Sequence, residues 1–470
     1  MAPHSTRSLY GRLPIALQNV LVAVAGWRSY RVRFGPEFRR LLEDLKRLDF
    51  NSDSQVRDDQ NRRLRDIVRW AATSVPYYRD LFRREGIDPE TIRTVDDLTR
   101  IPPLDKDVLR VDPASLLSEV VKRRRLVPGQ TSGTTGSAIS LWYTREALAW
   151  EYAVNWRQRG WYGIRPGTRY AAFGGQTIVP FSQVEPPFWR FDPQRQRMLF
   201  SLYHMKPAHL EAFARELAQP GYGFWQGYPS AISLVCAWML EHDFGLEEAA
   251  PKAVFTSSET LLAHQREKIE RATRAPVADR YGHAEFAASV LTCPVGSYHV
   301  DTEFCAIEID PRESGDGWVR GEILATGFCN RAMPLIRYRT GDLATLRTDG
   351  RCKCGRNRPI LEAIDGRIED YVVTPDGRWV GRMDHVFKEA RSIREAQIVQ
   401  RSPDRIELRF VPAAGFDDDT KLRLERELRL RLGPEMAIDW QPMGAIPRLP
   451  SGKFRAVVSE LPSSKVDAPG

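Results

Sequence analysis

Short apolar strands alternate with helical segments through the middle of this chain, from about residue 168 to residue 286. The stretches GFWQGY (223–228) and KAVFTSSE (252–259) are each followed by a segment with apolar residues at helical spacing. A third apolar stretch ends in YGHAEF (281–286). Because parallel strands need long crossover connections, usually helices, this alternation predicts an α/β fold with mainly parallel sheets.

Polar clusters follow these three predicted strands. They are Gly227–Ser230, Ser257–Glu259 and Tyr281–Glu285. In open α/β sheets ligands bind at the carboxyl ends of the strands. The sequence therefore predicts a small-molecule site built from these clusters.

The regions on either side have different patterns. Residues 36–88 carry apolar side chains at helical spacing, which predicts a helix-rich N-terminal segment. From about residue 298 the apolar residues alternate with period two, which is typical of antiparallel strands. After IDGRIED (364–370) we expect a compact α+β module, with a hairpin around residues 375–377 and a basic amphipathic helix at 419–432.

The chain has 470 residues and a formal net charge of +8, enough length for several domains and a large core. Basic and acidic residues are mixed along it, and the densest basic run is VKRRRL (121–126). A solvated face explains that run better than nucleic-acid binding, so we expect no nucleic-acid partner. The sequence does not indicate an oligomeric state.

The stretch LPIALQNVLVAVAGW (13–27) follows basic residues and resembles a signal peptide at first sight. Pro14, Gln18 and Asn19 interrupt its apolar core, and no run of eighteen apolar residues occurs in the chain. We expect an amphipathic helix that docks on the body of the protein or makes peripheral contact with a membrane surface. A cytoplasmic location without a transmembrane span follows from this interpretation.

The loop TSGTTG (131–136) combines glycines and hydroxyl residues ahead of an apolar, strand-like run. Such a loop exposes backbone N–H groups to an anion, although a plain turn has the same composition. The P-loop of kinases and GTPases is excluded because Ser137, and not Lys-Ser/Thr, follows Gly136. The G-x-G-x-x-G dinucleotide spacing is also missing.

Four further stretches complete an ordered set with this loop: YGHAEF (281–286), YRTGDL (338–343), DGRIED (365–370) and PRLPSGKFR (447–455). In this order the motifs resemble the ANL superfamily of adenylate-forming enzymes. The N-terminal patterns SVPYYRDLF and IDPETIRTVDDLTRIPPLDK are similar to the phenylacetate–CoA ligase branch, especially its members from capsule and exopolysaccharide gene clusters.

The resemblance, which covers about residues 60–456, implies a two-domain enzyme. A large N-terminal domain, 1–367, would contain the helical segment of about 1–100, the parallel sheets and a distorted barrel. A small mobile α+β domain, 370–470, would carry Lys453. Such enzymes join a carboxylic acid to the α-phosphate of ATP, release pyrophosphate, and pass the acyl group from acyl-AMP to a thiol. The resemblance implies ATP, Mg²⁺ and coenzyme A as partners.

The implied roles can be assigned motif by motif. The loop residues Thr131, Ser132, Gly133, Thr134, Thr135 and Gly136 would hold the β- and γ-phosphates, although the family's lysine after the last glycine is here Ser137. The adenine would lie against Tyr281, Gly282, Ser258 and Glu259, and the ribose hydroxyls would bind Asp342. Glu285 would hold Mg²⁺, Arg367 would lie near the ribose or phosphate, Lys453 would bridge the carboxylate and α-phosphate, and Glu369 would be the hinge. The acid itself would meet Trp225, Tyr228, Pro229 and His283, although ordinary packing explains all four residues equally well.

The second half-reaction is less constrained by the motifs. Where relatives continue the hinge with a segment near the incoming thiol, this chain has YVVTPDGRWVGRMDHVF (371–387). The acceptor could therefore be coenzyme A, a carrier protein or an amine in polysaccharide or natural-product biosynthesis. A non-catalytic nucleotide-binding scaffold is a further alternative, but scaffolding needs neither Lys453 nor Glu285. The aromatic residues near 223–228 hint at an aryl or apolar acid.

Four residues form a separate candidate site for a metal. Cys293 and His299 have the spacing C-x5-H, and Cys352 and Cys354 the spacing C-x-C. Thiolates with one imidazole are a ligand set for tetrahedral structural Zn²⁺. The alternative is that all four are ordinary buried residues, as we expect for Cys236, Cys305 and Cys329.

Overall fold

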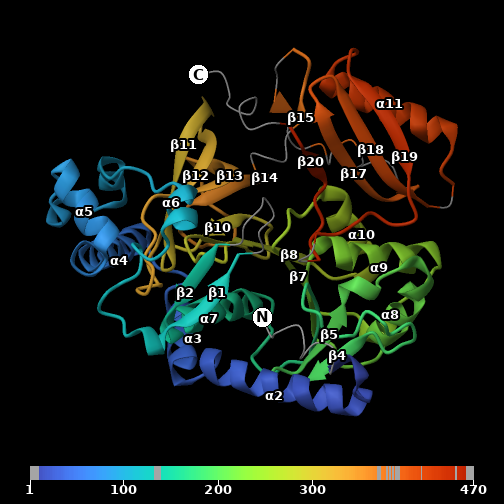
Figure 1. Cartoon of the computed structure of the whole chain (residues 1–470), viewed down its shortest axis with the longest axis horizontal. Helices are drawn as coiled ribbons and strands as arrows, with labels where there is room; N and C mark the ends of the chain where they lie inside the picture. The colour runs from blue at the N-terminus through green and yellow to red at the C-terminus, as the bar shows by residue number, and fades with distance from the viewer. Residues whose placement is uncertain are drawn as a thin grey trace. The chain divides into compact units, whose positions relative to one another are not determined.

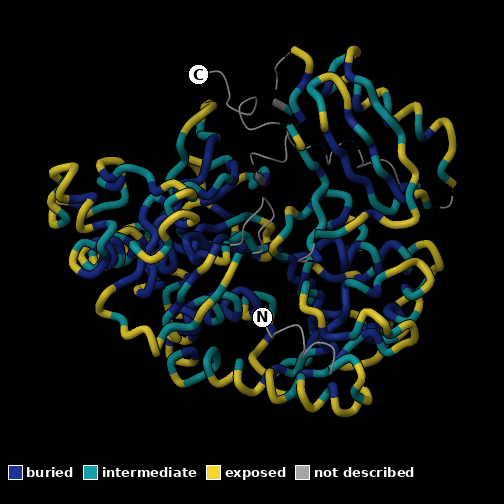
Figure 2. The backbone as a smooth tube through the Cα atoms, viewed as in Figure 1, coloured by how far each residue is buried: buried dark blue, intermediate teal, exposed yellow. Residues whose placement is uncertain are grey.

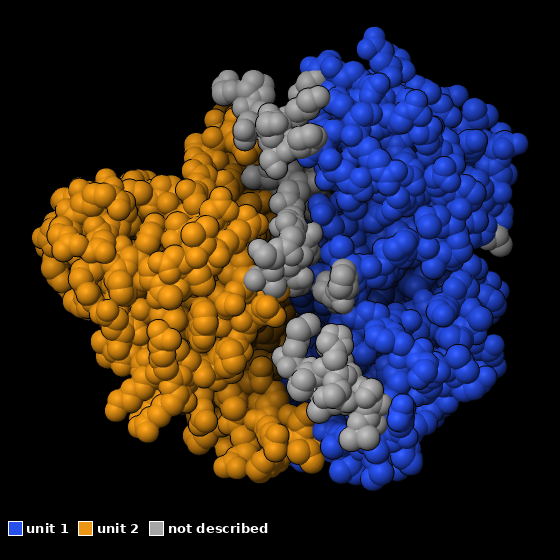
Figure 3. All heavy atoms as spheres, in the orientation of Figure 1, with its two compact units in different colours: residues 1–22, 168–277, 365–470 blue, residues 23–167, 278–364 orange. Residues whose placement is uncertain are grey.

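The computed structural model describes residues 10–131, 139–367, 372–376, 379–380, 383, 386, 392–413, 415–449 and 452–461 (Figure 1). The chain forms two compact units. Unit 1 comprises Met1–Val22, Thr168–Val277 and Asp365–Gly470, and unit 2 comprises Ala23–Gly167 and Ala278–Ile364 (Figure 3). The division at residues 367–370 that the motifs imply stays a prediction.

The parallel sheet predicted from the alternating segments lies in unit 1. Its strands, in the order β7-β6-β3-β5-β4, are Val254–Ser257, Phe224–Gly227, Tyr170–Gly174, Arg197–Ser201 and Trp189–Asp192. The pairs β3–β5, β3–β6 and β6–β7 are parallel, and β4 is antiparallel to β5. The helices between them are α8 (Leu210–Leu217), α9 (Pro229–Glu241) and α10 (Ala263–Thr273). Phe173, Phe200 and Ile232 belong to the core cluster of this part, which agrees with the apolar composition of strands covered on both faces.

The predicted C-terminal α+β module is also present. Its strands, in the order β19-β18-β17-β20, are Ala437–Pro442, Arg405–Pro412, Ile393–Ser402 and Val457–Ser459, and its helix is α11 (Asp418–Leu432). Leu424 and Leu428 of α11 share a core cluster with Ile398 and Leu408 of the sheet. The predicted hairpin is confirmed by β15 (Val372–Val373) and β16 (Trp379–Val380), which pair antiparallel.

Unit 2 contains the predicted N-terminal helices. They are α3 (Pro36–Arg47), α4 (Asp53–Ser74) and α5 (Pro76–Glu85), and two helices that the sequence did not predict follow, α6 (Lys106–Val111) and α7 (Arg145–Trp161). Helix α4 begins where sequence chemistry favours it, because Ser52 and Gln55 form a capping box. The pattern within 36–88 is therefore confirmed as three helices, with the break at Val75 before Pro76.

Antiparallel strands make up the rest of unit 2, as predicted from about residue 298. They are β9 (Ser289–Thr292), β10 (Tyr298–Val300), β11 (Cys305–Gly315), β12 (Trp318–Gly327), β13 (Tyr338–Arg347) and β14 (Ile360–Arg367). β8 (Val277–Gly282) pairs antiparallel with β9. A separate two-stranded sheet, β1 (Val127–Gln130) with β2 (Ser140–Tyr143), brackets residues 132–138, which lie outside the described residues.

The apolar stretch 13–27 is helical, as expected, within α2 (Ile15–Arg33). Among the described residues, the structure has no helix that is both long and apolar enough to cross a membrane.

Candidate functional site

Three predicted site residues lie together in unit 2. The hydroxyl of Tyr281, at the end of β8, donates to Asp342 Oδ2 on β13 at 2.8 Å. The same hydroxyl lies 2.6 Å from His283 Nε2, which is 3.3 Å from Asp342 Oδ2. With the Tyr281 hydroxyl donating to the carboxylate, its oxygen accepts from His283 Nε2–H. His283 Nδ1 is buried and has no hydrogen-bond partner among the described atoms.

A glycine turn orients the Asp342 carboxylate. Gly341 has φ +74°, a backbone conformation that glycine adopts without strain. Its N–H donates to Glu322 Oε1 at 3.1 Å, and the N–H of Asp342 donates to Thr340 Oγ1 at 3.1 Å. Arg339 in turn contacts Glu322 at 2.6 Å. The sequence Arg-Thr-Gly-Asp therefore fixes one carboxylate, 7% exposed, in a strand that is otherwise regular.

Glu285 lies on the loop after β8 and is 8% exposed. Its Oε1 accepts from the Tyr338 hydroxyl at 3.1 Å. The adjoining backbone is held by Tyr143, whose hydroxyl donates to the carbonyl of Ala284 at 2.5 Å. A buried carboxylate with so few donors keeps oxygen lone pairs for a hard cation, so its chemistry fits Mg²⁺.

In unit 1, Glu259 links three segments that are remote in sequence. Its Oε2 accepts from the backbone N–H of Ser230 at 3.2 Å, in the first turn of α9, where unpaired N–H groups favour a negative charge. Its Oε1 accepts from the backbone N–H of Phe454 at 2.5 Å. Burial raises the pKa of Glu259, and the Phe454 and Ser230 donors oppose that rise. The Glu259 carboxylate is therefore hydrogen-bonded to the backbone of Phe454, the residue that follows Lys453.

The loop that carries Lys453 is a tight turn. Leu449 N–H donates to the Lys453 carbonyl at 3.0 Å, and Gly452 N–H donates to the Leu449 carbonyl at 2.7 Å. Gly452 has φ +77°, and a Cβ at this position would lie 3.2 Å from the Cα of Gly175. A glycine is therefore needed both for the turn and for the close approach of two backbones.

The other predicted site residues of unit 1 lie at or just after the ends of strands and differ in burial. Trp225 is fully buried and belongs to the core cluster of unit 1, which agrees with the packing alternative, and its role at an acid pocket stays a prediction. Tyr228 caps α9 ahead of Pro229 and is half-buried, and burial together with nearby Glu259 raises its pKa to about 12. Ser258 has φ +73° at the end of β7.

Two motifs are only partly visible. Thr131 closes the base of its loop, because its N–H donates to the Ile139 carbonyl at 3.0 Å and its Oγ1 accepts from Ile139 N–H at 2.9 Å. Arg367 ends β14. The predicted phosphate residues Ser132, Gly133, Thr134, Thr135 and Gly136, and the predicted hinge Glu369, lie outside the described residues.

The Cys/His cluster (Cys293, His299, Cys352 and Cys354) is assembled in unit 2. All four ligand atoms lie within 4.8 Å of one another. Cys293 Sγ and Cys352 Sγ are 3.7 Å apart, and Cys354 Sγ is 3.3 Å from His299 Nε2. A disulfide needs an S–S distance of about 2.0 Å, so the sulfurs are not bonded. Tetrahedral zinc with Zn–S bonds of ~2.3 Å places its sulfurs about 3.8 Å apart, which matches the pair observed.

The local backbone explains how four separated residues meet. Cys293 and His299 flank the turn between paired strands β9 and β10, where Cys293 N–H donates to the Ser297 carbonyl at 3.0 Å. Burial lowers the pKa of His299 to about 4, which keeps its imidazole neutral. The other cysteines follow the core prediction, since Cys236, Cys305 and Cys329 are all buried.

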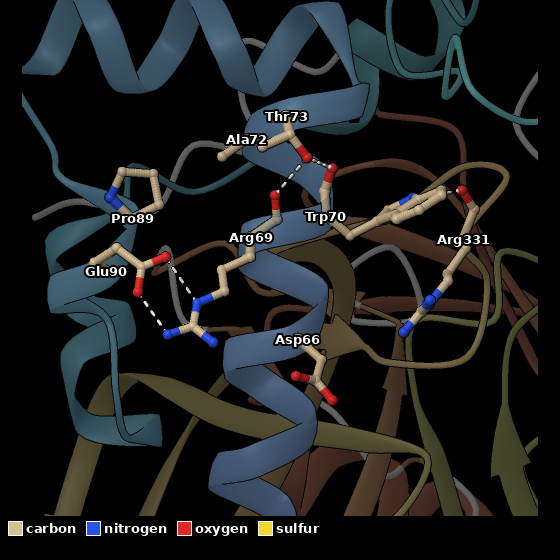
Figure 4. A pocket seen from close by; sticks show the side chains of 8 residues that line it. All are labelled: Asp66, Arg69, Trp70, Ala72, Thr73, Pro89, Glu90 and Arg331. Carbon is tan, nitrogen blue, oxygen red and sulfur yellow. Dashed lines mark hydrogen bonds and ion pairs between the residues drawn. The ribbon is translucent and has the colours of Figure 1, made fainter.

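A surface pocket of about 570 Å³ lies elsewhere in unit 2 (Figure 4). It is lined by Asp66, Arg69, Trp70, Ala72, Thr73, Pro89, Glu90 and Arg331. None of the predicted site residues is among them. Arg69 is already bound to both oxygens of Glu90, at 2.8 and 2.5 Å, and the Arg331 guanidinium lies over the Trp70 ring. The pocket is therefore not the nucleotide site that the motifs predict.

Comparison with known proteins agrees with the resemblance noted in the sequence. Residues 372–460 match the CapK C-terminal domain family. Protein CapK of Staphylococcus aureus is 23% identical over 457 residues, which cover 96% of this chain and 99% of CapK. A phenylacetate-coenzyme A ligase of Thermus thermophilus is 24% identical over 459 residues, covering 86% of this chain and 96% of that ligase.

A solved structure has the same fold. A crystal structure of 2-hydroxyisobutyryl-CoA ligase, in the postadenylation state with R3-HIB-AMP, aligns with a TM-score of 0.72 and 19% identity. The alignment covers 88% of this chain and 91% of that one. The predicted fold class, a large α/β part with a smaller C-terminal sheet domain, is confirmed.

Proposed function

We propose that this chain, a relative of CapK and of the phenylacetate–coenzyme A ligases within the ANL superfamily of adenylate-forming enzymes, is an AMP-forming acid–thiol ligase. Its first half-reaction would join a carboxylic acid to the α-phosphate of ATP and release pyrophosphate. The observation that carries the proposal is the cluster of Tyr281, His283 and Asp342, because two motifs 61 residues apart meet there around one carboxylate.

The residues have complementary tasks in this reaction. The Asp342 carboxylate accepts hydrogen bonds, which suits the two ribose hydroxyls. The buried Glu285 carboxylate would hold Mg²⁺, which would screen the phosphate charge. Lys453 would contact the reacting carboxylate and the α-phosphate, where negative charge concentrates in the transition state. Arg367 and the loop Thr131–Gly136 would contribute further phosphate contacts, and Glu259 would keep the Lys453 loop in place.

Pyrophosphate release tests this proposal directly. The protein is incubated with ATP and Mg²⁺ against a panel of aryl, alkyl and hydroxy acids, including phenylacetate and 2-hydroxyisobutyrate. We expect release that depends on one class of acid, and hydroxylamine should trap the acyl-AMP as a hydroxamate. Absence of acid-dependent release across the whole panel, from a protein that binds ATP, would favour the non-catalytic scaffold.

Coenzyme A is the acceptor we propose for the second half-reaction. A carrier protein or an amine is the second candidate. It is favoured by the sequence of residues 371–387, which differs from the segment near the incoming thiol in relatives and whose described part includes the hairpin β15–β16. Adding coenzyme A to preformed acyl-AMP should release AMP and give a thioester. If AMP is released only with an amine or a phosphopantetheinyl carrier, the acceptor assignment changes while the adenylation proposal stands.

We also propose that the Cys/His cluster holds a structural Zn²⁺. Cys293 and His299 are buried, Cys352 is 9% exposed, and Cys354 is partly exposed. Four protein ligands leave no open position for a substrate or water, so the ion would stabilise the fold and take no part in the chemistry. The cytoplasmic location inferred from the sequence is likewise kept as a proposal.

A further inference from the structure

Helix α2 is oriented opposite to an ordinary surface helix. In globular proteins the large apolar residues of such a helix face the core. Here Leu17, Val20, Leu21, Val24 and Trp27 are 44–56% exposed. Figure 2 shows exposed positions recurring along this helix.

The two buried positions of α2 are a polar residue and a glycine. Gln18 is 3% exposed, and Gly26 is buried as well. Gln18 Oε1 accepts from Arg190 Nε and Nη2 at 3.0 and 2.5 Å, and its Nε2 donates to the Leu13 carbonyl at 2.9 Å. These hydrogen bonds fix the rotation of the helix, so the outward direction of its large apolar side chains is built into the fold.

A neighbouring loop adds to the apolar surface. Arg190 also donates to Gln183 Oε1 at 2.8 Å, which ties the loop around residue 183 to the start of α2. Phe181 and Val184, on either side of Gln183, are 69% and 71% exposed. Two segments of unit 1 that are far apart in sequence therefore expose large apolar side chains next to each other.

The charge of this region is entirely of one sign along the N-terminal sequence. No Asp or Glu occurs before Glu37, whereas five arginines do: Arg7, Arg12, Arg28, Arg31 and Arg33. Arg12, Arg28 and Arg31 are exposed, and the Arg31 guanidinium lies 4.9 Å over the Trp27 ring. The neighbouring loop adds one exposed acid, Glu185. An aromatic and aliphatic stripe bordered by arginines complements the acyl chains and anionic headgroups of a lipid surface.

We propose that the outer face of α2, bordered at its N-terminal half in unit 1 by Phe181 and Val184, is a docking surface for anionic membranes, lying in the headgroup plane without crossing the bilayer. The apolar stripe would enter the acyl boundary, and the arginines would reach the phosphates with their stems along the apolar surface. The inference does not depend on the proposed ligase activity.

Vesicle co-sedimentation of the full chain tests the surface. Vesicles of phosphatidylglycerol and phosphatidylcholine in equal parts should bind the protein at least about tenfold more tightly than phosphatidylcholine alone, and salt should weaken the binding. Val24→Asp should lower binding at least about tenfold, because it places a charge in the apolar stripe. Arg28→Gln and Arg31→Gln should each lower it about fivefold, the equivalent of ~1 kcal/mol per arginine.

The matched control is Val111→Asp, which introduces the same charge at an apolar side chain that is 84% exposed on another helix. It should leave binding within about twofold. Leu21→Asp repeats the Val24 test if that variant fails to fold. The proposal is overturned if wild-type protein does not bind anionic vesicles, or if Val24→Asp and Val111→Asp behave alike. It is also overturned if the protein is a lipid-independent dimer that Val24→Asp dissociates, because a second copy then covers the face.

Discussion

The Cys/His cluster and the Lys453 loop were both predicted from short motifs, and the structure builds them in contrasting ways. Two of the four cluster ligands, Cys293 and His299, are buried and lie at the paired strands β9 and β10. The loop is held by two turn hydrogen bonds, by the Phe454 N–H on Glu259 and by the Gln397 amide on the Arg455 carbonyl. A metal site keeps its geometry when its ligands lie on rigid elements. A loop residue that acts in one half-reaction and then leaves needs contacts that cost little free energy to break.

Replacing Lys453 should give the largest effect and should separate chemistry from stability. Lys453→Ala is expected to lower acid-dependent pyrophosphate release by ~10²–10³, the usual cost of losing one transition-state contact. The zinc content should not change and the melting temperature should change little, because the substitution leaves the backbone hydrogen bonds of the turn in place. Acyl-AMP formation at the wild-type rate on the true acid would show that the role of Lys453 is misassigned.

Replacing a ligand of the Cys/His cluster should lower stability and zinc content, which the replacement of Lys453 should leave nearly unchanged. Cys352→Ser is expected to remove zinc and to lower the melting temperature by at least ~5 °C, because metal binding contributes directly to folding free energy. Elemental analysis of protein purified without a His-tag measures the zinc. Cys236→Ser is the control, since it alters a core cysteine and should leave the metal in place. Less than about a tenth of an equivalent of zinc in the wild type would remove the site.

Glu259→Gln tests whether adenylation depends on the hydrogen bonds that the Glu259 carboxylate accepts from the Lys453 loop and from α9. The amide keeps one acceptor oxygen where the carboxylate offered two, so one backbone donor loses its partner. We expect adenylation to fall about tenfold, in line with the ~1–3 kcal/mol cost of an unsatisfied buried group. Glu216→Gln, whose carboxylate accepts from the Tyr222 hydroxyl in the same unit, is the matched control and should retain activity. Equal losses in both variants would mean that Glu259 has no special role in the loop.

The smallest effect is expected at the predicted hinge. Glu369→Pro restricts φ at one position and should slow one half-reaction several-fold more than the other. Pyrophosphate release and thioester formation from preformed acyl-AMP measure the two steps separately. Equal loss of both steps in a folded variant would place the hinge elsewhere.

Residues whose partners are fixed by local chemistry were predictable. The capping box of Ser52 and the glycine turn before Asp342 both follow from short-range rules. The meeting of Tyr281 with Asp342 was expected only through the family resemblance, because spacing alone does not bring two strands together.

Contacts between remote segments were not predictable. Glu259 and Phe454 are 195 residues apart, and no pattern marks a backbone N–H as the partner of a particular carboxylate. Trp225 shows that the direction of a single side chain was not predictable either. An aromatic residue near a strand end can face a ligand or the core, and the sequence pattern is the same in both cases. The structure places Trp225 in the core cluster of unit 1. The outward face of α2 was also ambiguous, since its direction depends on the hydrogen bonds of Gln18 with Arg190.

The Gln18–Arg190 contact bears on any attempt to obtain a shortened enzyme. Arg190 is 1% exposed, and its described partners are the Tyr10 side chain and the amide or carbonyl oxygens of Gln18, Gln183, Pro187 and Trp189. Trimming the chain before residue 35 would remove Tyr10 and Gln18 and leave the guanidinium with the other three acceptors. We expect the folded state to lose about 1.5–3 kcal/mol for hydrogen bonds to a charged group. Truncation would therefore weaken folding as well as remove the exposed apolar face of α2.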